Sequence, residues 1–357
     1  MRSRLRFWKY PLSVILLLFV VAAFTLIYTL SNTAAAPYER VEPPEPVIVE
    51  QDPDDDLDGE DDPENIEDDI DIEEEPELGP IDILGNNPAE DGFIFIEADE
   101  SEIHKGYLLL VNHDHSYTIP SDLDLVNINQ AKTVPFRVQH DSSQLARSII
   151  EPLDEMMEAF MAATNFRAVA IISAHRNRES QQRILNNYIN RMGRREALRW
   201  ASLPGHSEHH TGLAFDFGVM HGNTRNSFPG TGTTGWFRRN AHKFGFILRY
   251  TQQKTHITQT SYEPWHYRYV GIPHSVIMFE KDLCLEEYID FLREFSFEEP
   301  LEFEHNDINY IIYFTSDTQI KIPINSEYQI SGNNIDGFII TAITYEVDEE
   351  NAEEFAV

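Results

Sequence analysis

Two short stretches of the chain bring together the residue types that a metal site of histidine and carboxylate ligands requires. The first runs from Ser207 to Asp216, where the imidazole of His209 is followed seven residues later by a carboxylate on a strand-like segment. The second runs from Glu263 to His266. Zinc in hydrolases binds three protein ligands and leaves a fourth position for water, and neutral His with Asp forms a suitable set. A Glu three residues before a ligand His can lie beside that water and act as a general base.

The sequence around these two stretches resembles that of the VanY-type D-alanyl-D-alanine carboxypeptidases, which are zinc peptidases. Their hallmark is a Ser-x-His-x6-Asp segment followed downstream by Glu-x-x-His, and it is matched in order by Ser207, His209, Asp216, Glu263 and His266. The similarity covers roughly 106–271. Further matching segments are Pro-Gly-His-Ser-Glu-His at 204–209, Asn-Ala-His-Lys-Phe-Gly-Phe at 240–246 and Glu-Pro-Trp-His-Tyr-Arg-Tyr-Val-Gly at 263–271.

The resemblance implies a single zinc ion, Zn2+, as the cofactor, with His209, Asp216 and His266 as its ligands. Glu263 would then be a catalytic residue, which takes a proton from the attacking water and later delivers it to the leaving amine. The sequence departs from the family pattern at some neighbouring positions, but at none of the three implied ligands.

A third landmark of the family is Ser-Ala-His-Arg, which ends here at Arg176 and is followed five residues later by Gln181. In the family these two side chains reach the substrate, and a guanidinium near the scissile carbonyl can stabilise the developing oxyanion. The resemblance therefore implies that Arg176 is catalytic and substrate-binding, with Gln181 and Ser207 holding the peptide end. The family usually has Tyr where His175 stands and often Gln where His210 stands. If its segment is extended, His210 points away from the metal ligand beside it, because side chains alternate along a strand.

The activity implied by the resemblance is that of a zinc-dependent D-alanyl-D-alanine carboxypeptidase, which hydrolyses the terminal D-Ala from peptidoglycan stem peptides. The same site could serve an L,D-carboxypeptidase, an endopeptidase or a dipeptidase, because the sequence does not show whether the groove is blocked at one end. A non-catalytic cell-wall-binding module is a further alternative. The intact ligand set together with Glu263 argues against it, since a pure binding module has no need of a base.

The helices and strands expected to position these residues indicate an α+β fold. From the resemblance we expect a small antiparallel sheet that carries the zinc site, with flanking helices, over residues 80–274. A left-handed cap at Gly245 is expected to end one helix. Hydrophobic spacing and β-branched content predict strands at 92–96, 106–111, 168–172 and 246–250, and helices at 144–163, 179–198 and 236–244.

The character of the sequence changes after Gly271. Residues 275–295 alternate apolar and charged residues at helical spacing, and residues 301–347 are rich in Ile, Tyr, Thr and Phe with turn signals at 331–334. We therefore expect a C-terminal helix followed by a small β appendage over 275–357. The appendage is expected to pack on the zinc domain as a structural cap, with glycan or partner binding as the alternative.

The chain has 357 residues with 27 Lys and Arg against 61 Asp and Glu, a formal net charge of −34. Residues 41–80 hold 20 acidic residues and no basic one. This balance argues against a nucleic-acid partner, and it predicts a disordered acidic linker over 37–79. Cys284 is the only cysteine, so no intramolecular disulfide is possible.

The N-terminus predicts a membrane anchor. Four basic residues, at positions 2, 4, 6 and 9, precede an uncharged run over 11–30, which would span about 30 Å as a helix. Residues 1–36 are therefore expected to form a cytoplasmic basic tip and a transmembrane signal anchor. The expected location is the cell membrane, as a single-pass protein with the catalytic domain extracellular. Cleavage near Thr33-Ala34-Ala35-Ala36 stays open.

Overall fold

The computed structural model describes residues 92–222 and 224–344. The predicted membrane anchor over 1–36 and the acidic linker over 37–79 lie outside the described residues. Within the two described ranges, no helix is both long and apolar enough to cross a bilayer.

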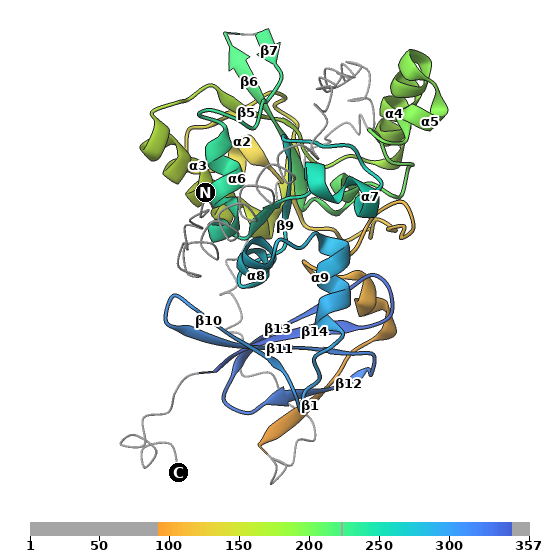
Figure 1. Ribbon diagram of the computed structural model, residues 1–357, viewed down its shortest axis with the longest axis vertical. Coiled ribbons are helices and arrows are strands. Elements are labelled where there is room, and N and C mark those ends of the chain that lie inside the picture. Colours follow the sequence, from red (N-terminus) through yellow and green to blue (C-terminus); the bar gives the residue numbers. More distant parts are fainter. Residues whose placement is uncertain (1–91, 223, 345–357) are drawn as a thin grey trace, which may run out of the picture. The chain divides into compact units, whose positions relative to one another are not determined.

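A central sheet of six strands lies in the part of the chain that carries the predicted site (Figure 1). Its order is β3-β5-β6-β9-β8, with β7 paired to β6, and every pair except β3–β5 is antiparallel. The strands are β3 (Arg137–Val138), β5 (Val169–Ser173), β6 (Ala214–His221), β7 (Thr224–Asn226), β8 (Phe246–Leu248) and β9 (His266–Tyr269). The expected antiparallel sheet thus gains one parallel edge, because α3 (Ile150–Thr164) carries the chain back between β3 and β5.

The main core lies on one face of this sheet. Phe215 and Phe217 of β6 and Tyr267 of β9 belong to it, and α3 and α6 (Gly235–Asn240) pack there (Figure 1). Because side chains alternate along a strand, the residues between them point to the other face. That second face carries Asp216 and His266, so the core fixes which side of the sheet can hold the site.

The predicted helices are present but divided. The stretch 144–163 begins as β4 (Gln144–Ala146), which pairs with β2 (Leu125–Asn127), and continues through η3 (Arg147–Ile149) into α3. The stretch 179–198 forms α4 (Arg178–Met192) and α5 (Arg194–Ala197), separated by Gly193 at φ +80°. The stretch 236–244 forms α6 and η5 (Ala241–Phe244), which ends at Gly245 in the left-handed conformation as predicted. The remaining short helices are η2 (Glu100–His104), α2 (Ile128–Ala131), η4 (Glu208–Thr211), η6 (Gln252–Lys254) and α7 (Thr255–Thr258).

The predicted strand at 106–111 was wrong. Its residues 108–111 are buried, and several of their backbone groups bind side chains in place of a neighbouring strand: the N–H of Leu108 donates to the Ser331 hydroxyl, and the carbonyl of Leu110 accepts from the Asn334 amide. The guanidinium of Arg268 donates to the carbonyls of Tyr107 and Leu109, at 2.9 and 3.0 Å. Such long-range pairing satisfies the buried backbone without a ladder, and no local pattern indicates it.

The β appendage has a four-stranded antiparallel sheet in the order β10-β11-β14-β13. A separate pair joins β12 to β1, so the first described strand of the chain completes the appendage. Helices α8 (His274–Lys281) and α9 (Leu285–Leu292), which replace the single predicted helix over 275–295, lie between the two sheets (Figure 1). The strands are β1 (Phe93–Glu97), β10 (Leu301–His305), β11 (Ile308–Thr315), β12 (Gln319–Pro323), β13 (Glu327–Gly332) and β14 (Phe338–Thr344).

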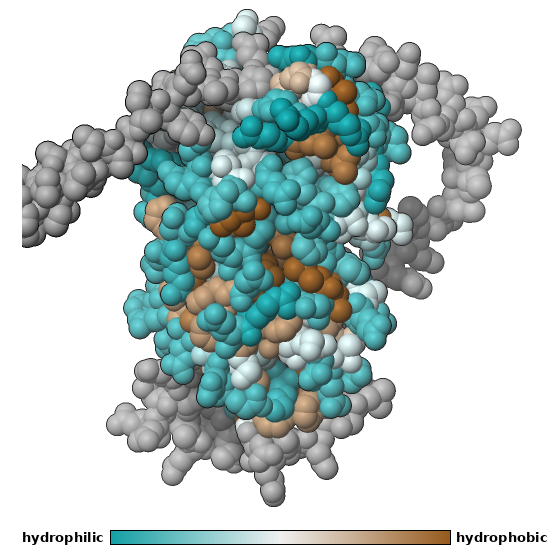
Figure 2. Space-filling view, turned by 45° about the vertical axis from the view of Figure 1, so that its right-hand side comes forward, coloured by the Kyte–Doolittle hydropathy of each residue, from teal (hydrophilic) through white to brown (hydrophobic). Residues whose placement is uncertain are grey.

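One hydrophobic cluster crosses from the domain of the six-stranded sheet to the appendage. It contains Ile247 of β8, Leu285 of α9 and Ile339 of β14. The appendage therefore packs on that domain through a shared core. Figure 2 shows a face on which hydrophilic residues predominate and hydrophobic residues form separate patches, and such scattered apolar residues are normal for a solvated surface.

A buried histidine links α8, α9 and β14. His274 lies within hydrogen-bond distance of the Tyr288 hydroxyl through Nδ1, at 2.8 Å, and of the Thr341 hydroxyl through Nε2, at 2.9 Å. Burial lowers the pKa of His274 to about 3. Because this value lies below that of an exposed imidazole, the stabilising contribution of neutral His274 is complete above about pH 6.5 and is lost as pH falls toward 3.

We expect a His274→Gln variant to lose less stability on acidification than the wild type. Both should be compared by urea unfolding in chelator at pH 7 and pH 5. The wild type should lose about 2 kcal/mol more between the two conditions, because only its unfolded state gains the proton. The other histidines are common to both proteins and cancel in the comparison. Equal losses would contradict a neutral, buried His274.

Candidate metal centre and active site

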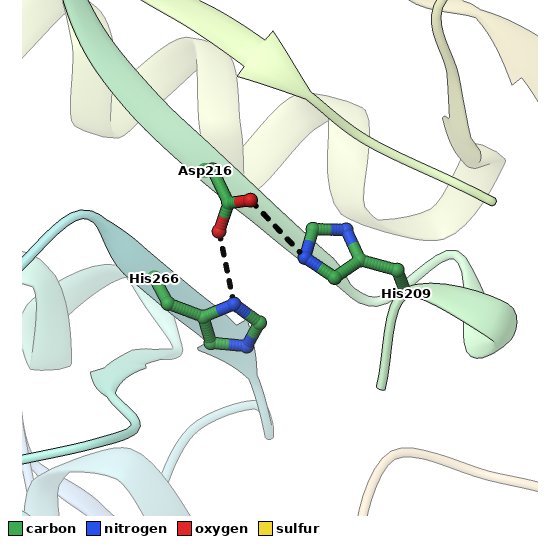
Figure 3. A group of neighbouring side chains, drawn as sticks. All are labelled: His209, Asp216 and His266. Atoms are coloured by element: carbon green, nitrogen blue, oxygen red, sulfur yellow. Dashed lines mark hydrogen bonds and ion pairs between the residues drawn. The ribbon is translucent and has the colours of Figure 1, made fainter. Parts of the chain in front are cut away.

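Three side chains offer ligand atoms to one point on the second face of the sheet. One ligand atom from each of His209, Asp216 and His266 lies within 4.8 Å of the other two. The carboxylate of Asp216 stands between the two imidazoles (Figure 3), at 3.4 Å from Nε2 of His209 and 3.0 Å from Nδ1 of His266. The structure thus brings together the three residues that the sequence predicts as zinc ligands.

Strand register places two of these residues. Asp216 of β6 and His266 of β9 are direct cross-strand partners, so their side chains stand next to each other on the same face. His209 comes from η4, and Gly212 at φ +70° turns the chain from η4 into the segment that leads to β6. A Cβ at that glycine would lie 3.0 Å from the Ala146 nitrogen. The segment 207–216 is therefore extended only from Ala214 onward, so the strand-like geometry holds for Asp216 and the extended condition considered for His210 is not met.

Hydrogen bonding leaves a lone pair of His209 directed at the site. Its Nδ1 lies 2.6 Å from the carbonyl oxygen of Ala174 and must donate, because a carbonyl only accepts. The other nitrogen, Nε2, is buried and makes no hydrogen bond among the described residues; its 3.4 Å approach to Asp216 brings two acceptors together, because the hydrogen of a neutral ring lies on Nδ1. Burial lowers the pKa of His209 to about 4. A neutral imidazole with an unpartnered, inward-facing nitrogen fits a metal ligand.

The other two ligand candidates are electrostatically coupled. Burial alone would raise the pKa of Asp216, but the adjacent imidazoles, His209 first, outweigh it and hold that pKa well below its ordinary value. Burial would lower the pKa of His266, but hydrogen bonds to Asp216 and Glu208 raise it to about 9. The cluster therefore holds a proton that a metal ion would displace, so metal binding here would release a proton.

Glu263 is buried beside this cluster. Its backbone N–H donates to the carbonyl of Tyr250 at 3.1 Å, and its own carbonyl accepts from the N–H of His266 at 3.2 Å, so its position is tied to β9. Burial raises the pKa of its carboxyl to about 8, and the charge of Asp216 adds to this effect while His266 and Arg176 oppose it. A carboxyl that titrates near neutral pH is suited to accept and return a proton.

Arg176 lies on the loop after β5, with its guanidinium directed at the cluster. Its Nη2 is 3.9 Å from Asp216, and its Nε is buried without a hydrogen-bond partner among the described residues. Its backbone N–H donates to the carbonyl of His209 at 3.2 Å. The structure therefore places a cationic donor with spare hydrogen-bonding capacity next to the candidate ligands, as oxyanion stabilisation requires.

The remaining predicted residues, Gln181 and Ser207, are both buried. Gln181 of α4 is buried and donates from Nε2 to the carbonyl of Ser202 at 2.8 Å, whereas its Oε1 is buried without a partner among the described residues. Ser207 is buried at the N-terminal end of η4, two residues before His209. An unpartnered buried oxygen on Gln181 is what a substrate-binding role predicts.

Two neighbours of His209 matter more than the sequence indicated. His210 is fully buried: its Nδ1 donates to the carbonyl of Arg176 at 2.6 Å, and its Nε2 accepts the N–H of Gly205 at 2.9 Å. It thus ties the Arg176 loop to the loop before η4. Glu208 hydrogen-bonds to His266. In the sequence, only their positions on either side of His209 indicated a role for Glu208 and His210. The helical turn of η4 is what directs both side chains inward.

Comparisons with known proteins agree with this geometry. A family model described as VanY: D-alanyl-D-alanine carboxypeptidase matches residues 142–272. A D-alanyl-D-alanine carboxypeptidase of Enterococcus faecium is 35% identical over 248 residues, which cover 68% of this chain and 77% of that protein. A D-alanyl-D-alanine carboxypeptidase of Enterococcus faecalis is 30% identical over 221 residues, which cover 58% of this chain and 74% of that protein.

A solved structure shares the fold. The crystal structure of the vancomycin-resistance D,D-dipeptidase VanXYg, in complex with a D-Ala-D-Ala phosphinate analogue, superposes with a TM-score of 0.63 at 35% sequence identity. The match covers 71% of this chain and 99% of that one. The similarity therefore extends beyond the segment that the family model matches.

We expect Asp216→Asn to weaken zinc binding of the metal-stripped protein by more than about 100-fold, because losing even an outer partner of a ligand costs roughly 10–100-fold. Competition with a chromogenic chelator measures the affinity. Asp307→Asn, the same change at an exposed turn between β10 and β11, is the matched control and should leave it unchanged. An Asp216→Asn protein that binds zinc like the wild type would remove Asp216 from the ligand set.

Proposed function

Because the chain belongs to the VanY family of D-alanyl-D-alanine carboxypeptidases, we propose that it removes the terminal D-alanine of peptidoglycan stem peptides with the help of one zinc ion. The family resemblance predicted from the sequence is thereby confirmed. The observation that carries the proposal is the convergence of His209, Asp216 and His266 on one face of the sheet, with Arg176 beside them.

The donor set fits zinc. Nε2 of His209, the carboxylate of Asp216 and Nδ1 of His266 would hold the ion, and the unpartnered Nε2 of His209 supports this assignment. When bound, zinc supplies Lewis acidity, which polarises a carbonyl and lowers the pKa of water.

The protein's own groups would perform the proton transfers and bind the substrate. Glu263 takes a proton from the attacking water and returns it to the leaving amine. Burial raises the pKa of its carboxyl to about 8, and a cation close by would lower that pKa and so favour the carboxylate that the first step needs. Arg176 stabilises the negative charge that develops on the scissile carbonyl oxygen. Gln181 and Ser207 hold the peptide end.

Dipeptidase activity is a second candidate. It is favoured by the solved D,D-dipeptidase, which matches this chain at 35% identity and a TM-score of 0.63. A dipeptidase must exclude the rest of the stem peptide from its groove, whereas a carboxypeptidase must admit it. The two functions therefore differ in the length of substrate that is cleaved, which an assay distinguishes directly.

We expect the full-length protein to release one alanine from a stem pentapeptide ending in D-Ala-D-Ala, and a chelator should abolish the reaction. Mass spectrometry of the products measures this, with the tetrapeptide and free D-Ala-D-Ala as parallel substrates. Cleavage of the tetrapeptide would indicate an L,D-carboxypeptidase, and cleavage of the free dipeptide alone would indicate a dipeptidase. Zinc-loaded protein that cleaves none of the three would overturn the proposal.

Glu263→Gln should retain zinc and lose turnover by about 10²–10⁴-fold, because the amide has no basic oxygen to accept the proton. Zinc content by elemental analysis and turnover of the pentapeptide are measured on the same preparation. Undiminished turnover with zinc bound would remove Glu263 from the role of base.

The location at the cell membrane is part of this proposal. It is supported by the uncharged run over 11–30 behind four basic residues, and by a 37–79 linker that could extend at most on the order of 140 Å. Such a tether would let an extracellular domain reach into the cell wall. Alkaline carbonate extraction of membranes tests it, since release of the full-length protein would contradict a spanning anchor.

A further inference from the structure

A buried network of charges lies directly behind the candidate ligand His266. Glu208 accepts from Nε of Arg249 at 2.7 Å and from Nη1 of Arg268 at 3.0 Å, both on its Oε1 atom. Its Oε2 atom lies 3.1 Å from Nε2 of His266. The side chains of Glu208, Arg249 and Arg268 have no exposed area.

The network is balanced in charge. Arg249 also forms a bidentate pair with Glu286 of α9, at 2.8 Å for both contacts, so two carboxylates face two guanidinium groups. The other terminal nitrogen of Arg268, Nη2, donates to the carbonyls of Tyr107 and Leu109. Burying four charges away from water is costly unless each is paired. Stability alone gives no reason to retain them, because an apolar set of similar volume would serve as well.

The position of the Glu208 oxygens provides such a reason. Both arginines bind Oε1, which leaves Oε2 as an acceptor directed at His266. A carboxylate that accepts at Nε2 of an imidazole places a hydrogen there, and the lone pair of a neutral ring then lies on Nδ1. Nδ1 is the atom that faces Asp216 and the other candidate ligands.

We propose that Glu208 is a positioning residue for the zinc ligand His266: held by Arg249 and Arg268, it accepts the Nε2 hydrogen and so presents Nδ1 to the metal. Ligand histidines commonly donate their second nitrogen to such a partner, which fixes the ring and raises its affinity for the metal. This inference rests on the zinc site of the proposed function and adds a residue to it.

The first test needs no substitution in the network. The zinc-loaded, full-length protein is labelled with 15N-histidine, and the ring signals of His266 are assigned by their loss in His266→Gln. The expected spectrum has a hydrogen on Nε2, protected from exchange, and zinc on Nδ1. Zinc on Nε2, or an Nε2 hydrogen that exchanges freely with solvent, would overturn the proposal.

The second test is Glu208→Gln. If the amide oxygen of Gln at position 208 still binds the two arginines, its NH2 group faces Nε2 of His266. Because NH2 cannot accept a hydrogen bond, the imidazole either loses this hydrogen bond or carries its hydrogen on Nδ1. Zinc affinity by chelator competition should therefore fall by about 10–100-fold. Unfolding in chelator separates this from a structural effect, because lower stability alone leaves the zinc affinity of the folded protein unchanged. A folded variant with wild-type affinity would overturn the proposal.

The matched control is Glu287→Gln on the same helix as Glu286. Glu287 pairs with Lys254 and accepts from the N–H of Cys284, and it has no contact with the network. Its variant should keep wild-type zinc affinity. Zinc binding by the wild-type protein separates the two proposals. If the wild type fails to bind zinc, the proposed function is overturned as well. If it binds zinc with an affinity that Glu208→Gln leaves unchanged, only the positioning role is overturned.

Discussion

The antiparallel pairing of β6 with β9 is the constraint on which the rest of the site depends. Its register sets Asp216 opposite His266, and the alternation of side chains sends Phe215, Phe217 and Tyr267 into the core behind them. A shift of one residue would exchange the two faces and bury the carboxylate in the aromatic cluster. The hydrophobic core thus selects the register, and the register assembles two of the three candidate ligands.

The same pair of strands also holds a second layer of polar residues. Arg268 stands two residues after His266 on the same face and binds Glu208, so one strand supplies both a candidate ligand and part of its support. The backbone carbonyls of Tyr107 and Leu109 accept hydrogen bonds from Arg268 and not from a neighbouring strand. Charged groups are retained in this interior because each has a fixed partner, and fixed partners leave the imidazole one orientation.

The β appendage is part of the same packed structure. It shares a hydrophobic cluster with β8 and α9, and His274 joins α8 to β14 through hydroxyl groups. Helix α9 presents Glu286 to Arg249 on one side and its apolar residues to the appendage on the other. Residues outside the segment that the family model matches therefore contact the groups that surround the candidate metal centre.

The sequence by itself determined the family, the α+β class and the residues that the structure brings together, because zinc chemistry limits ligands to a few residue types and those occur here at a recognisable spacing. It also indicated the longer helices and the strands β1, β5 and β8, whose periodicity is local. Only the tertiary structure decided that 208–211 forms the short helix η4, that 106–111 is no strand, and that Glu208 pairs with Arg249 and Arg268. These contacts join residues about 40–60 positions apart, and hydrophobic periodicity within one segment carries no information about such pairs.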